Sequence, residues 1–150
     1  METRNKILVP RRSPEERAKN FLIATNKKIQ EYIKNGSKGD LDLSNTPITS
    51  LPENLKVGGS LDLANTKITS LPDNLTVEGS LYLANTPITS LPENLTVGDD
   101  LDLGYTKITS LPENLTVGGY LYLRNTPISK QYTKEQVKQM VPGIKSIIYL

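Results

Sequence analysis

The sequence predicts a single-domain solenoid, in which short repeating units stack and bury their apolar side chains against their neighbours. The first observation is a 20-residue period, with blocks beginning at Leu41, Leu61, Leu81, Leu101 and Leu121. The second is a fixed pattern of L-x-L, Ile and Leu-Pro inside each full block. The third is the length of 150 residues, which suits one domain whose stacked units share a continuous core.

The N-terminal part, residues 1–38, is expected to hold a basic arm followed by a helix. Ser13 and Glu16 can form a capping box, and Pro14 suits the first helical position. Apolar residues then recur at helical spacing, which predicts a helix over about 14–34. These apolar residues are Phe21, Leu22, Ile29, Tyr32 and Ile33. We expect the helix to cover the open end of the solenoid, with its two aromatic residues toward the core.

The central part, residues 39–130, is expected to form five rungs. In the second block the leucines of L-x-L should point inward and the intervening Asp62 outward, as in a strand of three to five residues. Parallel strands of successive rungs then form a ladder at about 4.8 Å per rung. Leu71-Pro72 predicts an extended, proline-rich return segment, and the alternation over 75–77 predicts a second short strand.

The C-terminal part, residues 131–150, is expected to close the solenoid with a helix and a strand. Residues 133–136 match a capping box. The helix that follows should carry an apolar stripe, made of Val137, Met140 and Val141. The last three residues, 148–150, resemble the L-x-L pattern and are expected to form a sixth rung.

The sequence contains no cysteine and no histidine. Disulfides, thiolate or imidazole metal sites, Cys–His dyads and Ser–His–Asp triads are therefore excluded together. The carboxylates of the repeats do not have the spacing of a compact calcium loop, and an exposed acid–base pair has no pocket around it. We therefore expect a protein that is not an enzyme and has no cofactor, no metal and no small-molecule substrate.

Charge is distributed unevenly along the chain. Residues 1–38 carry ten Lys/Arg and four Glu, whereas residues 39–150 carry eight Lys/Arg and twelve Asp/Glu. A basic arm is thus joined to a mildly acidic solenoid. No apolar run approaches the ~20 residues of a membrane span. We expect no membrane partner and a cytoplasmic location in a bacterial or host cell, with secretion as an effector as the alternative.

The repeat resembles the short leucine-rich repeats of secreted bacterial effectors, which read L-x-V-x-x-N-x-L-x-x-L-P. In the second block the matching residues are Leu61, Leu63, Thr66, Ile68, Leu71 and Pro72, and the other blocks repeat them. The resemblance covers about residues 39–130 and implies a leucine-rich-repeat solenoid of the α/β class, mostly β. It also implies a phage or bacterial origin and a role in host interaction, for example inhibition of a host or defence protein.

Two features depart from the family pattern. Thr66 and its counterparts replace the ladder asparagine, and the neighbouring Asn65 is expected to share the task of satisfying buried backbone groups at the bend. The second Leu-Pro of the family repeat is replaced by N-L-T-V-G-G. Effector ligases of this family need a catalytic cysteine, and no cysteine is present to play that part, so ligase activity is not implied.

The repeats differ most at the outward position between the two leucines and just before and after the strand. Tyrosine and arginine gather there in the C-terminal half, and both are favoured anchors of protein interfaces. The predicted protein-binding residues are Tyr82, Asp100, Asp102, Tyr105, Tyr120, Tyr122 and Arg124. They are expected to bind a partner protein on the concave strand face. The competing interpretation is a solvated strand surface with cross-strand tyrosine packing.

Other functions stay open at this point. A structural or surface solenoid would have no discrete partner. A nucleic-acid-associated protein would use the basic arm, although the arm contains no nucleic-acid-binding motif and nucleic acid is the less favoured partner. Regular threonine–serine pairs such as Thr69-Ser70 suggest ice binding as a further alternative. Lysines such as Lys67 interrupt the face that would contact ice. A last strand left unpaired at Leu150 would also allow a homodimer.

Overall fold

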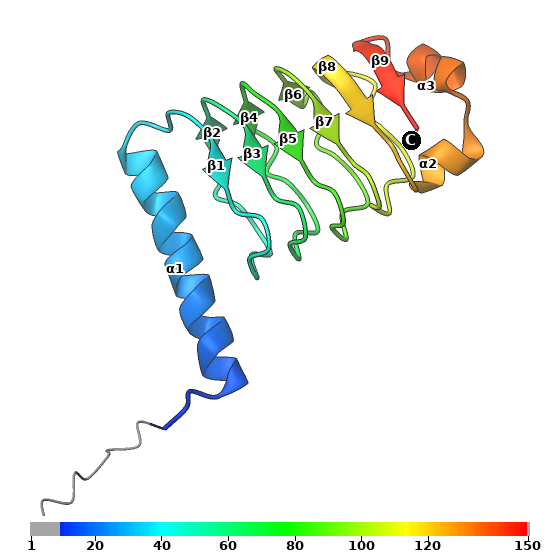
Figure 1. Ribbon diagram of the computed structural model, residues 1–150. Coiled ribbons are helices and arrows are strands. Elements are labelled where there is room, and N and C mark those ends of the chain that lie inside the picture. Colours follow the sequence, from blue (N-terminus) through cyan, green and yellow to red (C-terminus); the bar gives the residue numbers. More distant parts are fainter. Residues whose placement is uncertain (1–9, 150) are drawn as a thin grey trace, which may run out of the picture.

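The computed structural model describes residues 10–149 and shows a parallel β-solenoid with a helix at its N-terminal end and helices and a strand at its C-terminal end (Figure 1). Residues 1–9 and Leu150 lie outside the described part, and with them most of the predicted basic arm. The predicted class, a mostly β solenoid with helical caps, is confirmed.

Two ladders of parallel strands run along the solenoid. The first contains the L-x-L strands β1 (Leu41–Asp42), β3 (Leu61–Asp62), β5 (Leu81–Tyr82) and β7 (Leu101–Asp102). The second contains β2 (Lys56–Val57), β4 (Thr76–Val77) and β6 (Thr96–Val97). The longer strand β8 (Thr116–Tyr122) belongs to both, which gives the strand order β1-β3-β5-β7-β8-β6-β4-β2. Partners within both ladders are 20 residues apart, so the sequence period sets the register.

A tight bend follows each strand of the first ladder. Positive φ angles of 52–59°, a conformation that asparagine tolerates well, occur at Asn45, Asn65, Asn85 and Asn125. The threonine after each asparagine donates its hydroxyl to the carbonyl of the second leucine of L-x-L, as Thr66 does to Leu63 at 2.7 Å. The threonine hydroxyl therefore satisfies a buried backbone carbonyl, whereas the asparagine adopts the backbone conformation of the bend. This corrects the expectation that asparagine also helps to satisfy the buried backbone groups. The bend also ends the strands after two residues rather than three to five.

The core is a continuous column of aliphatic side chains. In the second rung Leu61, Leu63 and Ile68 are fully buried, and Leu75 and Val77 face them from the other side of the coil. The other rungs repeat these positions and form one cluster with the second. Burial of an aliphatic side chain contributes about 1.5–3 kcal/mol. Stacking of rung on rung is therefore the main source of stability.

Helix α1 (Pro14–Lys34) has the predicted bounds and the predicted capping box between Ser13 and Glu16. Its C-terminal half is seated on the first rung, where Thr25 and Ile29 are buried. Nearby, the Tyr32 hydroxyl donates to backbone carbonyls of the following loop, and burial raises the pKa of this phenol. No helix in the described chain has the length and apolar character needed to cross a membrane.

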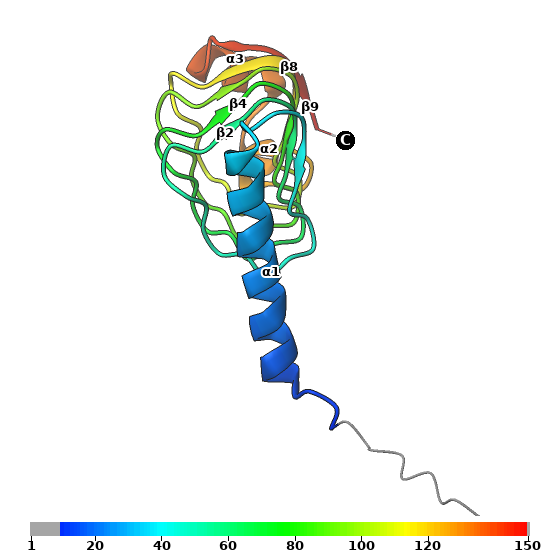
Figure 2. The same cartoon turned by 90° about the vertical axis from the view of Figure 1, so that its left-hand side faces the viewer.

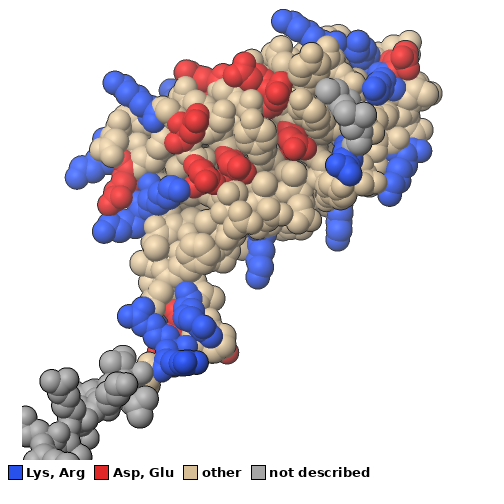
Figure 3. Space-filling model, viewed as in Figure 1, with Lys and Arg blue, Asp and Glu red and all other residues tan. Residues whose placement is uncertain are grey.

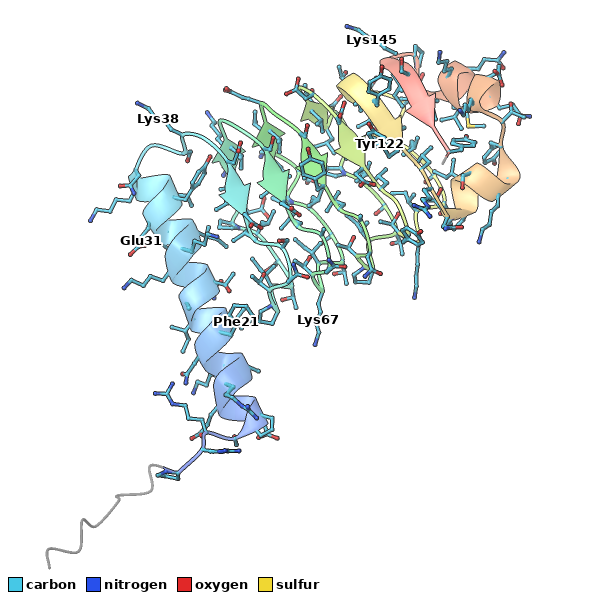
Figure 4. The ribbon with its side chains drawn as sticks, viewed as in Figure 1. Phe21, Glu31, Lys38, Lys67, Tyr122 and Lys145 are labelled. Carbon is cyan, nitrogen blue, oxygen red and sulfur yellow. The ribbon has the colours of Figure 1, made fainter. Side chains whose placement is uncertain are left out.

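The N-terminal half of α1 extends beyond the edge of the first rung, as Figure 2 shows in a view along the solenoid axis. Phe21 lies on this half and is 49% exposed (Figure 4). The prediction that both aromatic residues of the helix face the core is therefore wrong for Phe21, whereas Tyr32 packs against the core. A helix of 21 residues is about 32 Å long, so only part of it finds a surface to cover.

Two short helices, α2 (Pro127–Gln131) and α3 (Lys134–Met140), follow the fifth rung. The repeat pattern does not predict α2, because the same Thr-Pro pair continues without helix in the first and third rungs. Helix α3 begins with the predicted capping box at Thr133. Val137 and Val141 are buried, but Met140 is exposed and does not belong to the predicted apolar stripe.

Strand β9 (Ile144–Ile148) forms the predicted sixth rung and runs parallel to β8. Its register differs from the prediction by one residue, since Ile147, which is buried, lies opposite Leu121, where the prediction places Ile148. Tyr149 then follows at the position of the second leucine and packs against the core. Within the described chain β9 is the last strand at this end, and its pairing with a second copy stays a prediction.

Candidate functional site

The predicted binding residues come together on the outward face of the first ladder, over β5, β7 and β8. The register pairs Tyr82 with Asp102 and Asp102 with Tyr122, so these three lie in adjacent rungs. Tyr120 lies two residues before Tyr122 and therefore on the same face of β8. The remaining predicted members flank the strand ends: Asp100, Tyr105 and Arg124. We call Tyr82, Tyr105, Tyr120, Tyr122 and Arg124 the tyrosine face.

The tyrosines expose a large aromatic surface. The exposed fraction is 37% for Tyr82, 49% for Tyr105 and 48% for Tyr120. The rings of Tyr120 and Tyr122 are in contact, with centroids 6.2 Å apart and planes tilted by 53°. Burial raises the pKa of Tyr122, and the negative charge of Asp100 adds to this effect. Tyr122 (Figure 4) thus lies among the other aromatic rings and carboxylates of the face.

Tyr105 occupies the bend position at which the other four rungs have asparagine. Its φ angle is 58°, as at the asparagines. A bulky side chain is rare in this left-handed conformation, which costs about 1–2 kcal/mol. The guanidinium of Arg124 lies over the Tyr105 ring, 5.2 Å from its centroid, in a cation–π contact. An exposed tyrosine therefore occupies a strained backbone position at which the other rungs have asparagine.

Asp102 stabilises the bend of its own rung. Its Oδ1 accepts the backbone N–H of Gly104 at 2.8 Å. Asp62 makes the same bond in the second rung, and Asp42 accepts both the hydroxyl and the N–H of Ser44 in the first. The bonds from Ser44 hold the pKa of the Asp42 carboxyl below its usual value. The aspartates of this column therefore have a structural role that tyrosines at the same position do not share.

Asp100 belongs to a ladder of side-chain acceptors that links successive rungs. Its Oδ1 accepts the N–H of Tyr120 at 2.8 Å, and the Ser80 hydroxyl accepts the N–H of Asp100 at 3.2 Å. Ser60 and Asp40 continue the ladder toward the first rung. Asp100 thus helps to hold the start of the β8 L-x-L segment against β7. A structural role explains the presence of this carboxylate without any ligand.

Carboxylates gather on the strand side of the solenoid in Figure 3. Among residues 10–149 the single ion pair joins Lys27 to Glu31 on α1, so Asp100 and Asp102 make none. The same part of the chain holds no cluster of three or more side chains suited to a metal ion. The tyrosine face is therefore aromatic, with the carboxylates of Asp100 and Asp102 beside it and Arg124 as the cation at its C-terminal side.

A hollow of about 660 Å³ lies on the second ladder, away from the tyrosine face. One asparagine of each of the first three rungs lines it, namely Asn54, Asn74 and Asn94. Because the 20-residue period brings the same residue to the lining in each rung, the hollow follows from stacking itself. Lys56, at a position where the next two rungs have threonine, is its main departure from the repeat, and its lining contains no aromatic residue. We therefore do not take it as the candidate site.

No protein-family model matches the chain, and no curated protein is similar enough to count as a relative. The site is therefore interpreted from its own geometry. Sequence reasoning found the residues of the face but missed the structural bonds of Asp100 and Asp102 and the strained backbone of Tyr105. The sequence contains a signal for the strain, because Tyr105 replaces an asparagine that recurs in every other rung.

Proposed function

We propose that this protein is not an enzyme and that it binds another protein on its tyrosine face. The observation that carries the proposal is Tyr105, an exposed aromatic residue kept in a costly backbone conformation beside Arg124. The neighbouring exposed tyrosines add contact area at a modest loss of side-chain entropy. Aromatic residues and arginine of this kind dominate the binding energy of many protein interfaces.

The proposal extends to the family and the biological role. The parallel solenoid and the L-x-L, Ile and Leu-Pro spacing support membership of the leucine-rich repeats. By resemblance to the short bacterial type, the protein comes from a phage or a bacterium and acts in the cytoplasm on a host or defence protein, which it inhibits. Solenoids commonly offer their strand surface for such contacts.

The test is capture of a partner from the native host by the full chain and by variants of it, with mass spectrometry as the readout. The double variant Tyr82→Ala and Tyr122→Ala should lower recovery of a specific partner by about tenfold or more, because two aromatic anchors are removed. The double variant Lys56→Ala and Thr76→Ala, on the second ladder, is the matched control and should recover the partner normally. Circular dichroism should show that both variants remain folded.

Equal recovery by the wild type and the tyrosine variant would contradict the proposal. Recovery of no specific protein by any form would favour a structural solenoid without a discrete partner. Recovery of nucleic acid that disappears when residues 1–12 are removed would favour the nucleic-acid interpretation.

A further inference from the structure

Asp102 lies between two tyrosines of the neighbouring rungs. The register places Tyr82 in the rung before it and Tyr122 in the rung after it. Adjacent strands are about 4.8 Å apart, so the backbones that carry the two tyrosines are about 9 to 10 Å apart. Side chains stand roughly perpendicular to a sheet. The register thus places the two tyrosines on either side of Asp102, and we call the space between them, with the Asp102 carboxylate at its base, the slot.

The floor of the slot is charged but has no cation of its own. Asp102 makes no ion pair within residues 10–149. The nearby guanidinium of Arg124 lies over the Tyr105 ring instead. One carboxylate oxygen of Asp102 accepts from the N–H of Gly104, which fixes the carboxylate and leaves the second oxygen available. A fixed carboxylate between two aromatic rings is a suitable receptor for a positive charge.

We propose that the slot formed by Tyr82, Asp102 and Tyr122 takes one lysine or arginine side chain of the partner protein. The inference rests on the proposed function, because it names the chemistry that the tyrosine face recognises. A cation midway between the rings would lie about 5 Å from each, inside the ~6 Å reach of a cation–π contact. Its charge would meet the available oxygen of Asp102.

Charge complementarity decides between a cation and the other occupants. A neutral aliphatic side chain would remove water from the Asp102 carboxylate and return no hydrogen bond to it. An acidic side chain would add like-charge repulsion from Asp102 and from Asp100, which lies close enough to Tyr122 to act on its ionisation. A basic side chain is the occupant that compensates the desolvation of the carboxylate.

The first test uses short capped peptides as probes. Acetyl-Gly-Lys-Gly-amide is titrated into the full chain with isotope-labelled tyrosine rings, and the ring resonances are followed by NMR. The lysine peptide should shift the Tyr82 and Tyr122 resonances, whereas peptides with norleucine or glutamate in place of the lysine should shift neither. Equal shifts with norleucine would overturn the proposal, because binding would then not depend on charge.

The second test removes the charge of the floor but keeps its structural bond. In Asp102→Asn the amide oxygen can still accept from Gly104, so the bend is preserved. The affinity for the lysine peptide should fall by about fivefold, since an exposed ion pair is lost. The matched control is Asp62→Asn, which has the same bond to its own bend and a tyrosine on one side only. An unchanged affinity in Asp102→Asn would overturn the proposal.

Failure of the slot and failure of the proposed function can be told apart. If partner capture requires Tyr82 and Tyr122 but is equal for wild type and Asp102→Asn, the slot proposal is wrong and the proposed function stands. If capture does not depend on the tyrosines, the proposed function fails. The peptide titration then still decides whether the slot binds a cation.

Discussion

Tyr105 is the residue at which the repeat departs from the side chain that its backbone conformation favours. At the same bend the other rungs use asparagine, which adopts the left-handed conformation at low cost. Tyr105 adopts it with φ of 58° and supports the guanidinium of Arg124 on its ring. The backbone cost and the exposed ring are the observations on which the proposed binding role of this residue rests.

We predict that Tyr105→Asn stabilises the protein and weakens binding of the partner. Relief of strain of about 1–2 kcal/mol exceeds the loss of an exposed cation–π contact of about 0.5–1 kcal/mol. The free energy of unfolding should therefore rise by about 0.5–1 kcal/mol, as measured by urea denaturation followed by circular dichroism. Partner capture by the same variant should fall.

The reciprocal change supplies the control for this prediction. Asn85→Tyr places the same strain in the third rung and also removes the hydrogen bond that the Asn85 amide donates to Asn65 at 2.7 Å. It should lower the free energy of unfolding by at least about 1 kcal/mol. A Tyr105→Asn variant that is less stable than the wild type would show that Tyr105 serves the fold and not a partner.

Asp102, beside the tyrosine face, shows which property of a single residue the sequence could not predict. Asp102 and Tyr82 occupy equivalent positions, and both are polar enough to face solvent. Only the structure reveals that the carboxylate bonds to the N–H of Gly104. An aspartate at such a position can act through its charge or through a hydrogen bond to a nearby backbone N–H. Turn geometry decides between the two, and a pattern of residue types does not contain that geometry.

Among the elements, α1 was predicted with correct bounds because its signals are local. The capping box, Pro14 and the glycine after the helix are read directly from the sequence. How much of the helix the first rung covers depends on the width of the rung, a tertiary property. Phe21 and Ile29 recur at helical spacing alike, yet Ile29 is buried and Phe21 is exposed.

We predict that Ile29→Ala destabilises the protein by about 2–3 kcal/mol, because it leaves a cavity between α1 and the first rung. Phe21→Ala, on the projecting half of the same helix, should change the free energy of unfolding by less than about 0.5 kcal/mol. Both values are measured by urea denaturation. A Phe21→Ala effect as large as that of Ile29→Ala would mean that the N-terminal half of α1 is also packed.

Strand β9 shows the limit of prediction for elements outside the repeat. Two helices interrupt the 20-residue period before β9, so no spacing argument remains. Ile147 and Ile148 are both apolar, and the sequence alone does not decide which of them faces the core. The structure pairs Ile147 with Leu121, one residue earlier than predicted. A one-residue change of register exchanges the two faces of a strand, so the error affects every side chain of the rung.

For the whole molecule, the repeat made the fold predictable. A fixed period implies stacked copies, and stacking aligns Leu41 with Leu61 and the later leucines in turn. The same period limits what can be said of function, because residues shared by all rungs serve the stack. The sequence therefore predicts a candidate site only as a location, the outward positions where the rungs differ, and the structure brings the tyrosine face together there.

The measurement that tests the tyrosine face most directly is hydroxyl-radical footprinting of the full chain alone and in complex with the protein it captures. Oxidation of Tyr82, Tyr105, Tyr120 and Tyr122 should fall several-fold in the complex. Tyr132, which lies at the C-terminal cap, should be oxidised equally in both states and serves as the internal control. Equal oxidation of the four face tyrosines with and without the partner, together with protection elsewhere on the chain, would contradict a binding site on this face.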